Sequence, residues 1–450
     1  MLGKTRLLER VGQVRDAAAR MLGDAWNHAQ FEAARTRIEH QLDHGRLPEA
    51  FDGAQKLLDR ARAGGETAYP GADYDLGGAC WLGARVLRTA GDSEHALALL
   101  AEARRRFEAV AKERPGSGAE QMTFVCITER GDCLRDLGRL DQAAAAYEDA
   151  SRRAEQCGAS RDVAVDKLKL GSVRFLQRRN EEALAAYTEA RERFTDLDEP
   201  GTVASVWFRT GKVLQEVGRP EEAEDAYRKS LAISVRLGDL AGQAGTLGQL
   251  GNFYDDVLDR PEDAVGFYRQ SGEKYAEIGD AANEGRTSHN LADALRRLSR
   301  FGEARREVLR AIECDAQFGH GSEPWKTWDL LAQIETASGN PAASAEARGK
   351  TIAAYMAYRR DGGENHFPYG RVAHDVTQSL LAGDAASVAA PLEGLAANPD
   401  AAWLRPFIEA LQAIVAGSRD RTLAEAPGMH YTMAVEILLL IETLESPRPG

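Results

Sequence analysis

The side chains best placed to do chemistry are His40 and His44, which lie four positions apart in the stretch HQLDH. On a helix this spacing puts two imidazoles on one face, as in zinc-binding helices. A zinc site needs at least one further ligand, and a hydrolase of this type needs a base such as the Glu of HExxH. Neither stands near the pair. We therefore interpret it as part of a surface helix, and we expect no metal site and no cofactor.

The five cysteines do not indicate metal or redox chemistry either. They are odd in number and contain no CxxC, namely Cys80, Cys126, Cys133, Cys157 and Cys314. This usage is typical of a reducing compartment with free, mostly buried thiols. Cys126 and Cys133 are seven apart, on one face of a helix, so we expect them to pack.

Motifs of catalysis are missing from the sequence as well. No glycine-rich loop opens into Gly-Lys-Ser/Thr, and GxSxG does not occur. The net charge of −13 and pI of about 5.4 disfavour nucleic-acid binding, which needs clustered cations. The longest apolar run, Ile437 to Ile441, is too short to span a bilayer. We expect a cytoplasmic protein that is not an enzyme and binds neither nucleic acid nor membrane; its oligomeric state does not follow from the sequence.

A set of small and large residues recurs along the chain with a period of 40 or 41, and we call this pattern the ladder. A small residue is followed after 12 or 13 positions by Ala, and four positions later by a large side chain. The three sets are Gly131, Gly171, Gly211, Gly251, Ala292 and Ala332; Ala143, Ala183, Ala223, Ala264 and Ala304; and Tyr147, Tyr187, Tyr227, Tyr268 and Val308.

This ladder predicts pairs of antiparallel helices. The small residue of the first helix lets the second helix approach closely, and the Tyr, one turn beyond the Ala, fills the gap between pairs. The turns carry suitable breakers, such as Gly218 followed by Pro220, because Gly suits the position after a helix and Pro the first turn of the next.

The ladder, with GRPEEAEDAYRKSLAI as its clearest copy, resembles the tetratricopeptide repeat. Its long period, and the phrase LGDLAGQAGTLGQLGNFY with its echo IGDAANEGRTSHNLADAL, resemble the subtype of kinesin light chains and LGN/Pins adaptors. The resemblance implies an all-α, right-handed solenoid of about eight helix pairs over residues 31–360. We expect a capping helix at 1–30, or alternatively an exposed docking helix, and a cap of four helices at 361–450.

The resemblance also implies a partner, another protein or peptide, held in the concave groove lined by the first helices. In the family the ligand-facing positions lie six and three before the small residue, and one, four and five after it. Carried onto this sequence, the offsets select Asp132, Arg135, Phe175, Lys212, Gln215, Asn252, Asp255, Asp256, Arg286, His289, Asp293, Arg296, Arg297, Lys326 and Asp329.

Two features of this groove have two interpretations each. The fourth pair offers an apolar patch in the middle of the groove, made of Val165, Leu168, Ser172, Phe175 and Leu176. It either packs against the neighbouring pair or receives an apolar anchor side chain. The sixth pair is acidic and the seventh basic. That alternation matches either a ligand with charges in a defined order or a surface of internal salt bridges.

Two tryptophans, Trp325 and Trp328, stand close together in FGHGSEPWKTWDLL, followed by YMAYRRDGGENHFPYG. We favour packing, with a partner hot spot as the alternative. Bacterial arrays ending in such a phrase resemble the sensor halves of conflict systems that carry CHAT-type proteases or NB-ARC ATPases. The sequence thus favours an adaptor or scaffold, with a ligand-responsive regulator of such an effector as the alternative.

Overall fold

The computed structural model describes residues 26–365 and 367–446. Within these ranges the regular structure is helical and contains no strand, so the predicted all-α fold is confirmed. The predicted capping helix at 1–30 lies almost entirely outside the described residues. The contacts divide the chain into two compact units, residues 1–237 and 238–450, which we treat separately. The cap–array–cap boundaries drawn from the sequence stay a prediction.

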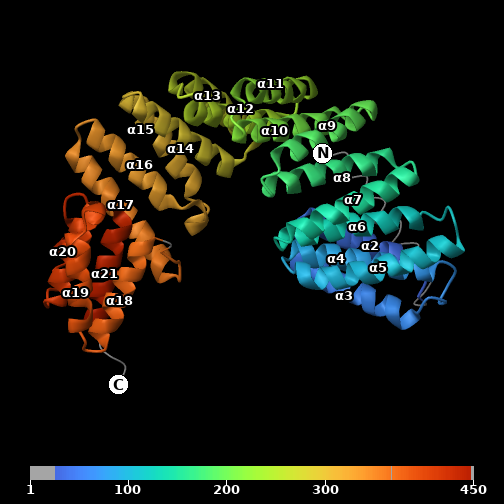
Figure 1. Cartoon of the computed structure of the whole chain (residues 1–450), viewed down its shortest axis with the longest axis horizontal. Coiled ribbons are helices and arrows are strands. Elements are labelled where there is room, and N and C mark those ends of the chain that lie inside the picture. Colours follow the sequence, from blue (N-terminus) through green and yellow to red (C-terminus); the bar gives the residue numbers. More distant parts are fainter. Residues whose placement is uncertain (1–25, 366, 447–450) are drawn as a thin grey trace. The chain divides into compact units, whose positions relative to one another are not determined.

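Five antiparallel helix pairs make up the described part of the first unit (Figure 1). They are α2 (His28–Asp43) with α3 (Leu47–Gly64), α4 (Ala72–Thr89) with α5 (Ser93–Glu113), α6 (Ala119–Asp136) with α7 (Leu140–Gln156), α8 (Ser160–Leu176) with α9 (Asn180–Asp196), and α10 (Pro200–Glu216) with α11 (Pro220–Leu237). Each later first helix packs against the second helix of the preceding pair, as α4 does on α3 and α6 on α5.

The second unit contains three more pairs, followed by four helices. The pairs are α12 (Leu240–Asn252) with α13 (Pro261–Ile278), α14 (Ala281–Arg297) with α15 (Phe301–Asp315), and α16 (Pro324–Ala337) with α17 (Pro341–Arg360). The last helices are α18 (Pro368–Leu381), α19 (Ala386–Ala397), α20 (Arg405–Val415) and α21 (Tyr431–Glu445). The described residues therefore hold the eight pairs and the four C-terminal helices that the sequence predicts.

The ladder has a direct steric basis. A Cβ added to Gly211 would lie 2.6 Å from the ring of Tyr227, and one added to Gly131 would lie 2.6 Å from Tyr147. Real Cβ atoms do not approach so closely, so these positions require glycine. Where the large position is Val308 instead of Tyr, the first helix carries Ala292, and both side chains are fully buried. The Gly–Tyr and Ala–Val combinations thus fill the same space in two ways.

The one 41-residue interval that follows Gly251 has a local cause. From Gly251 to Ala264 the ladder takes 13 residues, whereas 12 separate Gly211 from Ala223. The extra residue lies where α12 continues into a π-helical turn, η1 (Phe253–Val257). A π turn holds one residue more than an α turn, so α13 meets α12 with the ladder in place.

The C-terminal helices close on the last pair through aromatic packing. Trp325 of α16 is buried, and its ring lies 5.4 Å from Tyr355 of α17, which in turn lies 5.5 Å from Tyr431 of α21. The packing interpretation of Trp325 is therefore confirmed. Arg348 stands where earlier pairs have Tyr, and its guanidinium donates to the Met429 carbonyl at 2.5 Å. The last pair departs from the ladder because it meets a different neighbour.

Helix α21 is the most enclosed part of this end of the chain. Its residues Met433, Ala434, Val435, Ile437 and Ile441 are all buried. No helix in the described ranges is both long enough and apolar enough to cross a bilayer.

Candidate protein-binding site

The first helices α4, α6, α8 and α10 are consecutive neighbours in the first unit, and we call their shared exposed side the first-helix face. In Figure 1, α7 lies between α6 and α8, and it packs against both. In the second unit, α12, α14 and α16 hold the corresponding positions. The residues selected by the family offsets lie on these helices, except Asp255 and Asp256, which lie in η1 directly after α12.

Asp132 is a buried structural anchor. Its carboxylate accepts hydrogen bonds from the Tyr147 hydroxyl at 2.7 Å and from the Lys169 ammonium at 2.5 Å, and Arg135 lies 3.6 Å away. Arg135 also pairs with Asp136 at 2.8 Å. Buried carboxylates need such partners. Asp132 therefore joins two helix pairs, through Tyr147 of its own pair and Lys169 of the next.

The bond between Tyr147 and Asp132 has counterparts in other pairs. In each, the hydroxyl of the ladder tyrosine bonds to a side chain on the first helix of the same pair. The hydroxyl bonds are Tyr147 with Asp132 at 2.7 Å, Tyr187 with Ser172 at 3.1 Å, Tyr227 with Gln215 at 2.9 Å, and Tyr268 with Asn252 at 2.8 Å. In three pairs the partner directly follows the ladder glycine. Lys212, which cannot accept, stands there in the remaining one, so Gln215 takes the bond.

Sequence reasoning assigned three of these partners, Asp132, Gln215 and Asn252, to ligand binding. Asp132 and Asn252 directly follow a ladder glycine, and that shared position was the signal for a bond to the tyrosine hydroxyl. The seventh pair agrees with this view. Val308 has no hydroxyl, and the corresponding Asp293 instead accepts from Arg296 at 2.7 Å.

The charged stretch of the second unit is also paired internally. Arg297 of α14 forms an ion pair with Asp255 of η1, and Asn252 accepts from Asn290 at 3.2 Å. Asp255 is buried, and burial raises the pKa of its carboxyl while Arg297 opposes that shift. Asp255 and Arg297 thus neutralise one another, as the salt-bridge interpretation predicts for these two residues.

The remaining selected residues of the second unit lie nearer to solvent. Asp256, Arg286 and Lys326 are exposed, and Lys326 pairs with Glu323 at 2.6 Å. Asp329 accepts from Gln333 at 2.8 Å. His289 is half-buried, and burial lowers the pKa of its imidazole, so it is neutral at pH 7.

An apolar patch lies on α8 and α10 of the first-helix face. Phe175, Val165 and Leu168 are half-buried against the core between these pairs, which confirms that part of the patch packs. Leu176, however, is 55% exposed. Phe208, three positions before Gly211, is half-buried beside Tyr227, with ring centroids 5.9 Å apart. We name Phe175, Leu176 and Phe208 the apolar patch. The offset that selects Phe208 was available in the sequence, yet that residue was overlooked.

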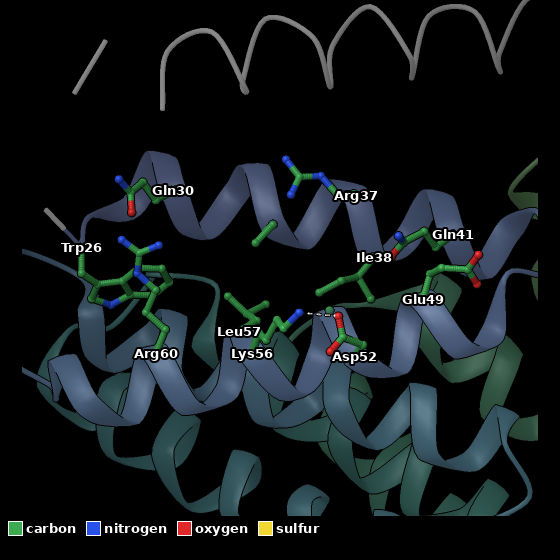
Figure 2. Close-up of a pocket in the computed structure, with 12 residues that line it drawn as sticks. Trp26, Gln30, Arg37, Ile38, Gln41, Glu49, Asp52, Lys56, Leu57 and Arg60 are labelled. Atoms are coloured by element: carbon green, nitrogen blue, oxygen red, sulfur yellow. Dashed lines mark hydrogen bonds and ion pairs between the residues drawn. The ribbon is translucent and has the colours of Figure 1, made fainter. Parts of the chain in front are cut away.

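Two further features of the first unit were not foreseen. Asp166 of α8 is 1% exposed, with one oxygen accepting from the Thr128 hydroxyl at 2.6 Å and the other without a hydrogen-bond partner. Burial raises the pKa of Asp166 to about 7. Next to α2 and α3 there is a groove of about 370 Å³, lined by residues that include Trp26, Ile38, Leu57 and Arg60 (Figure 2).

The histidines and cysteines considered above for metal binding and redox chemistry have the following surroundings. His40 of α2 and His44, which directly follows α2, stack with ring centroids 4.0 Å apart, and Arg46 contacts His40. Within the described ranges, no three His, Cys, Asp or Glu side chains are grouped to hold a metal. Cys126 and Cys133 are buried, as predicted.

Comparisons with known proteins agree with the repeat. Tetratricopeptide repeat models match residues 127–157 and 164–234. No curated protein matches the sequence. A solved structure with the same fold is the STAND signal transduction ATPase with a tetratricopeptide repeat sensor from Pyrococcus horikoshii. It is 15% identical with a TM-score of 0.54, and the match covers 77% of this chain and 56% of that one.

Two other solved structures are similar over parts of the chain. BtubC (BKLC) from P. vanneervenii is 24% identical with a TM-score of 0.45, covering 52% of this chain and 92% of its own. The Rap conjugation gene regulator of plasmid pLS20, in complex with the Phr* peptide, is 17% identical with a TM-score of 0.40, covering 66% and 76%. The stacked helix pairs with their Gly–Tyr ladder, and the repeat models that match residues 127–157 and 164–234, show that the chain contains tetratricopeptide repeats.

Proposed function

We propose that the chain is a non-enzymatic adaptor that binds an extended segment of another protein along the first-helix face of the first unit. The observation that carries the proposal is the apolar patch. Leu176 at the end of α8 exposes more than half of its surface, and Phe175 next to it in the chain and Phe208 on the neighbouring first helix α10 are half-buried. Partly exposed apolar side chains of this kind are typical of the anchor points of a protein interface.

The charges around the patch indicate the chemistry of the partner. Lys212, on α10 with Phe208, is exposed, and Arg209 is exposed one residue after Phe208. The acidic side chains of α6 are engaged, Asp132 by Tyr147 and Lys169. We therefore expect a segment that carries a large apolar side chain close to an acidic one.

Substitution of Leu176 by Glu tests the proposal. Leu197 is the control, because it is a partly exposed leucine (36%) that directly follows the second helix α9 and does not belong to the first-helix face. We expect Leu176→Glu to lower recovery of the native partner from cell extract about tenfold, the effect of losing one anchor side chain. Leu197→Glu is expected to recover as much as the unchanged chain, by quantitative mass spectrometry. Equal losses with both variants would contradict the proposal.

A second candidate function is a ligand-responsive regulator that acts on an effector protein. The division of the contacts into two compact units favours it, because a chain built of two bodies has a route to change shape. Small-angle scattering with and without the recovered partner segment is the test. A radius of gyration that stays constant at saturation would exclude this candidate and leave the adaptor.

A further inference from the structure

A groove of about 490 Å³ lies in the second unit, lined by residues of the second helices α13 and α15 and of the first helix α14. Helix α14 packs against both of the others. Its lining residues, Thr287, Ser288 and Leu291, are all buried, so α14 forms the floor of the groove. Gly272 of α13 and Glu307 of α15 stand at the sides. We call this site the α13–α15 groove.

The groove is open because two positions of the repeat carry small side chains. In the first unit, Trp207 of α10 stands four positions before the small ladder residue of its pair, and Arg191 of α9 stands four positions after the large ladder residue of the pair before. The ring centroid of Trp207 lies 4.1 Å from the Arg191 guanidinium and 4.5 Å from the ammonium of Lys229 on α11. In the second unit the first two positions hold Ser288 and Gly272. The space that a tryptophan and an arginine fill in one pair is therefore left open in the other.

Two polar side chains that line the groove have no partner. Ser288 is 4% exposed, and among the described residues its hydroxyl has no hydrogen-bond partner. Glu307 is half-buried, and its carboxylate forms neither a hydrogen bond nor an ion pair with the part of the chain that the structure describes. Burial raises the pKa of the Glu307 carboxyl, although Arg269 and Arg310 oppose the shift. Because buried polar groups are normally hydrogen-bonded, this pair indicates a site for a donor from outside the chain.

The charges of the groove favour a cationic donor. The arginines that line it already have carboxylate partners, in the ion pairs Arg269–Glu303 and Arg310–Glu284. The carboxylates that line it, Glu273 and Glu307, have no such partner within the described ranges. Negative charge is therefore in excess, and the complementary ligand is positive. A guanidinium carries several N–H donors in one plane, so it can reach a carboxylate and a hydroxyl together.

We propose that the α13–α15 groove binds an arginine side chain from a basic segment of a partner protein. The aliphatic part of that arginine lies along Gly272 and Ala276, and its guanidinium donates to the Glu307 carboxylate and the Ser288 hydroxyl. The ligand then fills the space that Arg191 fills in the first unit. This site shares no residue with the apolar patch and takes the opposite charge, so it does not rest on the proposed function.

Binding of a peptide probe to the full-length chain tests the proposal. The probe is a short capped peptide with one central arginine among glycine, alanine and serine, and its control carries citrulline, which keeps the shape of arginine and lacks the charge. We expect saturation-transfer NMR to show binding of the arginine peptide with a dissociation constant on the order of 1 mM, and of the citrulline peptide about tenfold more weakly. Equal affinities, or no binding of the arginine peptide, would overturn the proposal.

Substitutions at two positions of the groove assign the binding to it. Glu307→Gln is expected to weaken binding of the arginine peptide about tenfold, whereas Glu313→Gln, at an exposed position of α15 outside the groove, should leave it unchanged.

Gly272→Arg gives the chain its own guanidinium at the position of Arg191 and is expected to abolish binding. A Cβ at Gly272 would meet no atom nearer than 3.9 Å, so the fold and its melting temperature should be kept. Gly272→Ala leaves the groove open and should bind as the unchanged chain does. Undiminished binding by Gly272→Arg, or equal effects of the two Glu variants, would show that the arginine binds elsewhere and would overturn the proposal.

Discussion

Arg297 of α14 forms an ion pair with Asp255, whose carboxylate is buried in the π-helical turn that ends α12. The pair joins two successive first helices. Removing the cation leaves a buried carboxylate with no opposite charge, which is costlier than losing an exposed pair. Arg297 and Asp255 therefore contribute to the stability of the second unit.

We expect Arg297→Ala to lower the free energy of unfolding by about 2 kcal/mol, because Asp255 stays buried while part of the Arg297 side chain is open to water. Urea titration followed by circular dichroism measures the change. Arg286→Ala, at an exposed position of the same helix, is the control and is expected to change stability by less than about 0.5 kcal/mol. Similar losses in the two variants would show that the ion pair does not stabilise the fold.

The Gly–Tyr contact predicts that a smaller side chain at the tyrosine position offsets the replacement of the glycine. Gly211→Ala places a methyl group 2.6 Å from the Tyr227 ring and is expected to destabilise the first unit by about 2 kcal/mol through overpacking. Tyr227→Val in the same chain reproduces the Ala292–Val308 combination and should make the two changes less than additive. A double-mutant cycle measures this coupling. Additive losses would contradict the steric explanation of the ladder.

Asp166 predicts how stability varies with pH. Its pKa of about 7 in the fold lies above its ordinary value near 4, so the folded chain holds a proton that the unfolded chain has released. This carboxyl therefore makes stability fall as pH rises from about 4 to 7, with no further change above its folded pKa. Asp166→Asn removes that fall. We expect its melting temperature to exceed that of the unchanged chain at pH 8, and the difference to shrink toward pH 4.5.

Thiol reactivity predicts which cysteines are accessible. Cys157 is exposed and Cys314 partly so, whereas Cys80, Cys126 and Cys133 are buried. Burial raises the pKa of the Cys80 and Cys126 thiols to about 12 and of Cys133 to about 11, so little thiolate forms at pH 8. We expect Ellman's reagent to label Cys157 first, Cys314 more slowly, and the other three only after unfolding. Rapid labelling of Cys126 in the native chain would contradict this packing.

The fold could be predicted from the sequence because its main determinant is a steric one. Gly131 and Tyr147 lie 16 residues apart and touch, and the same contact recurs in each later Gly–Tyr pair. A distance restraint that repeats with a fixed period is visible in a single sequence. The spacing of 13 positions from Gly251 to Ala264 was visible in the sequence in the same way. That the additional residue lies in a π-helical turn became clear only from the structure.

The candidate site was harder to predict, because a side chain on the correct helix face can have a partner from another helix. Lys169 reaches Asp132 across 37 positions, and Arg297 reaches Asp255 across 42. Such partners depend on which helices become neighbours and on their rotation. The family offsets select the side of the helix, and they do not distinguish a residue that meets a ligand from one that holds a tyrosine hydroxyl.

The π-helical turn also bears on how the array can vary in length. Because Phe253–Val257 holds the additional residue inside a continuous helix, Gly251 and Ala264 keep partners of the same kind as in the other pairs. A repeat array can therefore hold a one-residue insertion at the end of a first helix as a π-helical turn, without changing how the two helices of that pair meet.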